Sequence, residues 1–382
     1  MSVAAAAGLE GVVATSSRLC YLDGERGVLA YCGHDIHDLA REATFEEVCY
    51  LLWHQRLPSR AELGDLQTEL ARARPLPEPV LRLMRSLPPG NLMDAVRTVV
   101  SALAHYDPDA DDNSQTAAIR KAVRVTAQAG TVVATLGRLA AGRAPIDPDP
   151  VLGHAANFLY LLTGDRPEAL AERAFDVALI LHADHELNAS TFAGRVAAAT
   201  LTDLYSTVVA GVATLKGPLH GGANAEVMKL LESIGEDADD ERVTTTITGM
   251  LGRKQKVPGF GHRVYRTEDP RATHLRQMSR DLGQQGGNSR WFEISQRIEE
   301  VMRTETGINA NVDFYSASTY HALGIATDLF TPIFVVSRVS GWTAHALEQY
   351  ANNRLIRPRA EYVGPDYPQS FVPLAERPPA FR

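Results

Sequence analysis

The sequence has few cysteines, no long apolar run and no excess of basic residues, and each shortage excludes a class of protein. The three cysteines are Cys20, Cys32 and Cys49. Their odd number and the lack of a Cys-x-x-Cys pair fit no disulfide framework. No apolar stretch approaches the roughly 18 residues that span a membrane. Acidic residues, 46 of them, outnumber the 38 basic ones, whereas a general nucleic-acid-binding protein needs a basic surface. We therefore expect a cytoplasmic protein with no nucleic-acid partner and no membrane association.

The rest of the composition is that of a globular protein, and its patterns are helical. The 382 residues are 45% hydrophobic and 22% charged, and a chain of this length is expected to form two or three domains. Residues 45–52 place apolar side chains at the i, i+3, i+4, i+7 spacing of one helix face. Thr44 with Glu47, and Ser59 with Glu62, have the spacing of a capping box. Further helices are predicted over 92–103, 116–140, 168–187, 194–214, 222–234, 289–305 and 338–353.

Strand signals are confined to residues 18–32. Tyrosines and small apolar residues flank Asp23-Gly24 there, which is the pattern of a hairpin around a tight turn. The sequence therefore predicts a mainly α protein with one small N-terminal β element.

The first segment rich in ionisable side chains is HADHELNAST, residues 182–191. His182 and His185 are three residues apart, which places them on one face of a helix. With Asp184 they could hold a metal ion, one of them could bind a substrate, or they could be hydrogen-bonded core residues. This segment alone leaves the three interpretations open.

The second segment is LKGPLHGGANAEVMKLL, residues 215–231, in which glycine and proline interrupt a helical pattern around His220. A histidine at a helix N-terminus feels the positive end of the helix dipole, which disfavours its protonated form. A neutral imidazole can donate to a carbonyl oxygen and stabilise an enolate-like oxygen. The alternative is a plain turn between two helices.

The third segment, residues 254–276, is basic although the chain as a whole is acidic. Pro258, Gly259 and Gly261 predict an irregular loop that ends at His262. Carboxylates and phosphates are the natural partners of the surrounding cations, and the alternative is a solvated basic surface. The six cations are Lys254, Lys256, Arg263, Arg266, Arg271 and Arg276.

The fourth segment, residues 309–324, places Asp313 among apolar residues at the start of a predicted helix. A carboxylate in such surroundings can have a raised pKa and act as a general base. The alternative is that Asp313 only caps the helix. Further along, Arg338, Arg357 and Arg359 either bind carboxylates or lie at the surface.

These segments occur in the order and spacing found in citrate synthase, which the chain resembles from GLEGVVATSSRLCYLDGERGVLAYCG (8–33) to RPRAEYVGP (357–365). The matching motifs are HADHELNAST, GPLHGGAN, GFGHRVY with DPRA, NVDFYS, and SRVSGW with NNRLIRPRAEYVG. The resemblance implies a mainly α homodimer with a large domain, 1–220 plus 318–382, and a small domain, 221–317, that closes over the substrates. The chain is too short for the extra N-terminal domain of the hexameric relatives, so we expect a homodimer.

The resemblance also implies a role for each matching residue. His220 matches the histidine that hydrogen-bonds the acetyl-CoA carbonyl oxygen. Asp313 matches the base that removes a methyl proton, and His262 matches the histidine that polarises the oxaloacetate ketone. These three form the predicted catalytic set.

Substrate-binding roles follow in the same way. His185, Arg271 and Arg338 match residues that bind oxaloacetate, as does Arg357, which the partner subunit would supply. The predicted coenzyme A contacts are Lys256, Val257, Gly259, Phe260, Gly261, Arg266 and Asn311. Neither a cofactor nor a metal is expected, and His182 receives no role in the chemistry.

Three other interpretations compete with a citrate synthase that starts the tricarboxylic acid cycle. A 2-methylcitrate synthase would use propionyl-CoA with the same residues, alone or as a second activity, because one methylene is worth only about 1–3 kcal/mol. A metal-dependent hydrolase would be built on His182, Asp184 and His185. A helical interaction protein without catalysis would carry the motifs as remnants.

Overall fold

The computed structural model describes residues 7–9 and 11–377, which form two units. The body covers residues 17–355. The second unit consists of the terminal segments 7–9, 11–16 and 356–377, and it contains two short 3-10 helices, η1 (Ala7–Leu9) and η4 (Leu374–Glu376).

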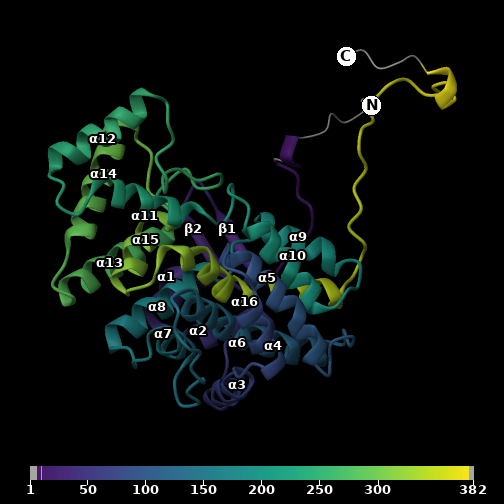
Figure 1. The fold of residues 1–382 in the computed structure, drawn as a ribbon, viewed down its shortest axis with the longest axis horizontal. Coiled ribbons are helices and arrows are strands. Elements are labelled where there is room, and N and C mark those ends of the chain that lie inside the picture. Colours follow the sequence, from purple (N-terminus) through teal and green to yellow (C-terminus); the bar gives the residue numbers. More distant parts are fainter. Residues whose placement is uncertain (1–6, 10, 378–382) are drawn as a thin grey trace. The chain divides into compact units, whose positions relative to one another are not determined.

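The body is mainly α, as predicted, with one small sheet (Figure 1). Its strands are β1 (Cys20–Asp23), β2 (Val28–Tyr31) and β3 (His34–Asp35). Its helices up to residue 163 are α1 (Ile36–Glu42), α2 (Phe45–His54), α3 (Arg60–Ala73), α4 (Glu78–Ser86), α5 (Leu92–Leu103), η2 (Ala104–Tyr106), α6 (Gln115–Ala140) and α7 (His154–Thr163). Those that follow are α8 (Ala169–His182), α9 (Ala189–Ala198), α10 (Leu204–Leu215), α11 (Ala223–Ile234), α12 (Asp240–Gly252), α13 (Pro270–Gln285), α14 (Arg290–Thr306), α15 (Val312–Ala322), η3 (Thr327–Leu329) and α16 (Phe330–Ala351).

The predicted hairpin is confirmed, and a third strand extends it. β1 and β2 are antiparallel, with Asp23 opposite Val28, and β3 pairs antiparallel with β2. The four residues 24–27 form the turn between the first two strands.

Local sequence explains how several helices begin. In α2, the Thr44 side chain accepts from the Glu47 N–H while the Glu47 carboxylate accepts from the Thr44 N–H, and Ser59 and Glu62 repeat this arrangement in α3. Both predicted capping boxes are therefore present, each satisfying two N–H groups that a helix start leaves without partners.

Three predicted helix boundaries were wrong. The helix predicted over 168–187 ends at His182. The segment 194–214 forms the end of α9 and nearly all of α10, separated by a break in which Leu201 has a φ of 63°. The helix predicted over 338–353 begins at Phe330 and ends at Ala351.

Helix α16 has many neighbours in the body. It packs against α2, α6, α8, α9 and α10 near the middle of the body (Figure 1). A Cβ on Gly341 would lie 2.3 Å from the carbonyl oxygen of Ala183, so only glycine allows α16 to approach the segment that follows α8 this closely.

Helices α11 to α15 lie together on one side of the body (Figure 1). α15 packs against α11, α13 and α14, and α12 packs against α14. The division into a large and a small domain at residues 220 and 318 stays a prediction. Among residues 7–9 and 11–377, no helix combines the length and apolarity that a membrane span requires.

Candidate active site

His220 lies in the turn between α10 and α11, where its imidazole faces Ser190. Its Nε2 accepts from the Ser190 N–H at 3.2 Å and lies 2.7 Å from the Ser190 Oγ. A ring that accepts through Nε2 carries its proton on Nδ1, which is then the free donor. Burial, helped by Arg338, lowers the pKa of His220 to about 4, so the ring is neutral near pH 7.

The turn that holds His220 is fixed by close backbone contacts. The Gly221 N–H donates to the Leu215 carbonyl at 3.0 Å, and a Cβ on Gly221 would lie 2.4 Å from that same oxygen. The Thr331 hydroxyl, at the start of α16, donates to the Gly221 carbonyl at 3.1 Å. The glycine is therefore needed for the chain to pass this point.

His262 follows the glycine-rich loop and is held through its other ring nitrogen. Its Nδ1 accepts from the N–H groups of Val264 and Tyr265 at 3.0 and 3.1 Å, which leaves Nε2 as the protonated nitrogen of a neutral ring. Burial, with a contribution from Arg271, lowers the pKa of His262 to about 4.

His185 is buried beside His262. The two ring centroids are 5.3 Å apart, and the His185 Nε2 lies 3.2 Å from the Tyr265 hydroxyl. Burial, together with Arg271, His262 and Arg338, lowers the pKa of His185 well below its ordinary value. The structure thus brings two predicted histidines together with a tyrosine to which the sequence analysis gave no role.

Arg271 is buried at the start of α13 and pairs with Asp269. Its Nε and Nη2 donate to the two carboxylate oxygens of Asp269 at 2.9 and 2.8 Å. Burial opposes the charged form of both groups, but the ion pair outweighs it: the pKa of Asp269 is lowered and that of Arg271 is raised. The Asp269 carboxylate also accepts from the N–H groups of Arg271 and Val312, so it joins the starts of α13 and α15.

Asp313 occupies the first turn of α15 and is partly buried. Burial raises the pKa of its carboxyl to about 6, against the opposing effect of Arg271 and Arg338. Asn311 caps the helix, because its side-chain oxygen accepts from the Asp313 N–H at 3.0 Å. The capping interpretation of Asp313 is therefore wrong, and the direction of its pKa shift is as predicted.

Arg338 is buried in α16, and its charge affects the pKa of His185, His220 and Asp313. Its Nε donates to the carbonyl oxygen of His182 at 2.6 Å, and its guanidinium lies over the Phe334 ring. Burial lowers the pKa of Arg338 to about 10, so it stays charged near pH 7. His182 therefore supports Arg338 through its backbone, while the His182 Nδ1 contacts the Ala178 carbonyl at 2.7 Å.

The predicted coenzyme A loop runs beside the start of α15. The Gly261 N–H donates to the Asn309 carbonyl, the Asn311 N–H donates to the Gly259 carbonyl, and the Asn311 side chain donates to the Gly261 carbonyl. Gly259 has a φ of 79°, and a Cβ there would lie 2.9 Å from the Phe314 Cβ. Phe260 and Ala310 form a β-bridge, Val257 is buried, and Lys256 and Arg266 are exposed.

Six predicted residues therefore surround one region of the body, while Arg357 belongs to the terminal unit. Arg357 and Arg359 are both exposed there. The charge of Arg271, of Arg338 or of both contributes to the pKa shift of each of the three histidines and of Asp313. The six residues are His185, His220, His262, Arg271, Asp313 and Arg338.

The metal-site interpretation of residues 182–185 finds no support in the geometry. Across residues 7–9 and 11–377, no three His, Cys, Asp or Glu side chains converge as metal ligands. The Asp184 carboxylate faces His345 instead, with its Oδ1 3.2 Å from the His345 Nε2.

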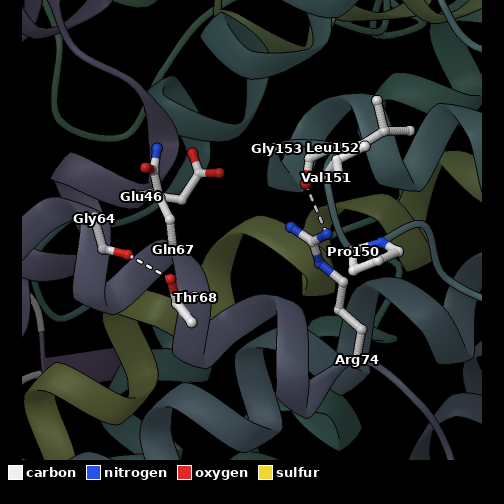
Figure 2. Close-up of a pocket in the computed structure, with 9 residues that line it drawn as sticks. All are labelled: Glu46, Gly64, Gln67, Thr68, Arg74, Pro150, Val151, Leu152 and Gly153. Atoms are coloured by element: carbon white, nitrogen blue, oxygen red, sulfur yellow. Dashed lines mark hydrogen bonds between the residues drawn. The ribbon is translucent and has the colours of Figure 1, made fainter.

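A separate cavity of about 230 Å³ lies away from these residues, and none of them lines it (Figure 2). It lies between α2, α3 and the loop before α7. Arg74 is its buried cation, but it already donates to the carbonyl oxygens of Asp149 and Leu152 at 3.1 and 2.7 Å. The lining residues are Glu46, Gly64, Gln67, Thr68, Arg74, Pro150, Val151, Leu152 and Gly153.

Three residues of the site received no role from the sequence. Ser190 holds the ring of His220, Tyr265 contacts His185, and Asp269 pairs with Arg271. Asp269 had a readable signal, because an aspartate followed by proline is typical of a helix start. Ser190 and Tyr265 act through contacts with residues that are distant in sequence, so no sequence signal indicated their roles.

Known proteins resemble this chain over nearly its whole length. The family model described as citrate synthase, C-terminal domain, matches residues 8–359. Citrate synthase 2 of Bacillus subtilis is 51% identical over 372 residues, which are 97% of this chain and 98% of that protein. The citrate synthase of Haloferax volcanii is 49% identical, with coverage of 97% and 98%. A 2-methylcitrate synthase of Shewanella oneidensis is 40% identical, with coverage of 97% and 98%.

Solved structures agree with this. The crystal structure of the Pyrobaculum aerophilum citrate synthase matches with a TM-score of 0.90 and 39% identity, covering 97% of this chain and 95% of that one. The Thermoplasma acidophilum citrate synthase, solved as a ternary complex with carboxymethyl coenzyme A and oxaloacetate, matches with a TM-score of 0.90 and 33% identity, covering 97% and 99%. The chain belongs to the citrate synthase family.

Proposed function

We propose that this protein is a citrate synthase that condenses acetyl-CoA with oxaloacetate and hydrolyses the resulting citryl-CoA to citrate and coenzyme A. The observation that carries the proposal is the set of His220, His262 and Asp313. Two neutral imidazoles with free N–H donors and a carboxyl of raised pKa surround one region that also holds buried arginines.

The first step is removal of a methyl proton from acetyl-CoA. A thioester C–H is a weak acid, so its loss requires a base in position and a donor for the oxygen that gains charge. Asp313 takes the proton, and the Nδ1–H of His220 donates to the thioester oxygen. Because Ser190 occupies the Nε2 side of the ring, His220 presents this donor without first losing a proton.

In the second step the enol carbon attacks the ketone of oxaloacetate. A carbon–carbon bond forms, the carbonyl π bond breaks, and the ketone oxygen gains the charge and then a proton. The Nε2–H of His262 is the donor for that oxygen, since its Nδ1 is engaged by two backbone amides. Water then attacks the citryl thioester, and the coenzyme A thiol leaves.

Oxaloacetate is a dianion, and we assign its binding to His185, Arg271 and Arg338, with Arg357 from the partner subunit. Arg271 uses only one edge of its guanidinium on Asp269, which leaves Nη1 for a substrate carboxylate. Binding of oxaloacetate would close the small domain and exclude water before acetyl-CoA reacts. No metal or prosthetic group is required for these steps.

Coenzyme A is assigned to the loop beside α15. Lys256 and Arg266 are exposed cations that suit its phosphates, and the backbone of Val257, Gly259, Phe260 and Gly261 would line the thioester arm. Asn311 ties this loop to the helix that carries Asp313. The base and the acyl group would therefore be placed by one connected piece of structure.

A homodimer is part of the proposal. The terminal unit exposes apolar side chains, among them Tyr367 and Phe371, which are 93% and 84% exposed, and such residues favour burial against a partner. Sedimentation should give twice the 41.5 kDa chain mass. A monomer at micromolar concentration would remove the proposed source of Arg357.

The direct test of the function is thiol release from acetyl-CoA by the purified protein. We expect release only when oxaloacetate is present, with citrate formed in equal amount. Release without oxaloacetate would indicate a hydrolase, and no release would contradict the proposal. Recovery of the activity in the cytoplasmic fraction of the source cells would check its location, consistent with a role at the start of the tricarboxylic acid cycle.

A second candidate is 2-methylcitrate synthase activity, alone or alongside the first. The S. oneidensis relative carries that name at 40% identity, below the 51% and 49% of the two citrate synthases, so citrate synthase is the main proposal. The chemistry is the same, and the difference is one methylene in the acyl pocket.

A further inference from the structure

We propose that the β1–β2 turn, residues 24–27, positions His262 by holding the loop that follows it. This inference rests on the proposed function of His262. The Arg266 N–H donates to the Gly24 carbonyl at 2.9 Å, which joins the turn to a stretch, residues 262–268, that contains neither helix nor strand. The turn is thus an anchor for a loop that has no regular structure of its own.

The fit between turn and loop is close enough to require glycine at position 24. A Cβ there would lie 2.2 Å from the carbonyl oxygen of Val264 and 2.8 Å from its carbonyl carbon. Both are backbone atoms, so the contact cannot be relieved by a side-chain rotation. Gly27 makes a second close approach, because a Cβ there would lie 2.6 Å from the Thr267 Oγ1.

One peptide group transmits this contact to His262. The Val264 carbonyl that packs on Gly24 and the Tyr265 N–H that donates to the His262 Nδ1 belong to the same planar unit. A displacement of the oxygen therefore turns the N–H away from the ring. The Tyr265 hydroxyl also contacts His185, so the same displacement would reach a second predicted substrate-binding residue.

The consequence concerns which nitrogen of His262 carries the proton. Two N–H donors on Nδ1 keep the proton on Nε2 and fix the direction in which it points. Without them either nitrogen can be protonated, and the ring can rotate. The ketone oxygen would then lose a donor that is already in place before the reaction.

The test uses Gly24→Ala, with Glu25→Ala in the same turn as the matched control. The φ of Gly24 lies outside the left-handed region, so alanine costs the turn little, and the change acts through the Val264 contact. Glu25 is exposed and has no part in the site. We expect kcat for thiol release to fall by about tenfold or more in Gly24→Ala, with no change in Glu25→Ala.

A second variant removes the contact without a clash. Replacing residues 24–27 by Asn-Gly should keep the hairpin, since Asp23 pairs with Val28 and Asn-Gly is the preferred two-residue hairpin turn. It should show the same loss of kcat, so the test survives if Gly24→Ala does not fold.

A spectroscopic measurement separates positioning from general damage and does not depend on turnover. With ¹⁵N-labelled histidine, the His262 signal, assigned by its loss in His262→Gln, should report Nε2–H in the wild type and a mixture of tautomers in both turn variants. Wild-type kcat in both variants would overturn the inference, and so would a slowed enzyme with an unchanged His262 signal. An inactive wild type would instead contradict the proposed function.

Discussion

Replacing Asp313 with asparagine is expected to lower kcat for thiol release by about 10²–10⁴-fold, the usual contribution of a general base. Asparagine keeps the shape of the side chain and its place in the first turn of α15, but it cannot accept the methyl proton. The KM values for both substrates should change much less, because Asp313 makes no assigned contact that binds either one. Steady-state thiol release at saturating substrates measures the effect.

The pH dependence of stability gives the same variant a second readout. Burial raises the pKa of Asp313 to about 6, so between its unfolded value, about 3.9, and 6 the native state holds a proton that the unfolded chain has lost. The ionised carboxylate therefore costs native stability above pH 6. The midpoint of thermal unfolding of Asp313→Asn should exceed that of the wild type at pH 7.5, and the difference should shrink toward pH 4.

Asp328→Asn is the control for this variant. Asp328 is exposed in η3, and its replacement should leave kcat unchanged. If Asp313→Asn turned over at close to the wild-type rate, Asp313 would not be the base.

Replacing His220 with alanine is expected to lower kcat by about 10²–10³-fold, the usual cost of losing one oxyanion donor. The ring donates through Nδ1 only because Ser190 engages Nε2. Burial and Arg338 keep its pKa near 4, so the wild-type donor should not titrate between pH 6 and 9. Acid loss of kcat should instead follow Asp313, falling as the pH drops through about 6.

His105→Ala is the control here, because His105 is exposed at η2, outside the site. If the Nδ1 donor of His220 is essential for enolisation, exchange of the acetyl-CoA methyl protons with solvent should be slower in His220→Ala than in the wild type. If exchange stayed at the wild-type rate while condensation fell, His220 would serve a later step than enolisation.

Local capping signals predicted the starts of α2 and α3 correctly, whereas α1, α4 and α7 were not predicted. The capping boxes at Thr44 and Ser59 are present as predicted. The helix predicted over 168–187 ends early because donors from far along the chain take its last carbonyl groups: the Tyr31 hydroxyl donates to Ile180, and Arg338 donates to His182. These two donors lie 149 and 156 positions away in the sequence, so the local spacing of apolar residues contains no sign of them.

The sequence analysis also missed helices that are largely polar. The spacing analysis did not predict α12 or α13, because each buries only a narrow apolar stripe against its neighbours. α13 nevertheless begins with an Asp-Pro pair at Asp269 and Pro270, and this start signal was readable. The break between α9 and α10 was similarly marked by Asp203, whose side chain caps α10.

The residues of the site also differ in how well the sequence predicted them. The residues that would touch substrate stood in recognisable motifs, and the structure brings six of them together. Ser190 and Tyr265 contact His220 and His185 through hydrogen bonds that span 30 and 80 positions. Asp269 pairs with Arg271 only two positions away, but it also accepts from the Val312 N–H, 43 positions away. A single sequence does not reveal such pairings, and the net charge of −8 hides the arginines that face the region.

The measurement that tests the central claim most directly is thiol release with acetyl-CoA and with propionyl-CoA, each with and without oxaloacetate. The account predicts oxaloacetate-dependent release with acetyl-CoA at a higher kcat/KM than with propionyl-CoA, and its loss in Asp313→Asn. A preference for propionyl-CoA would make the protein a 2-methylcitrate synthase with the same machinery. Thiol release that does not depend on oxaloacetate, or that continues at the wild-type rate in Asp313→Asn, would contradict the mechanism itself.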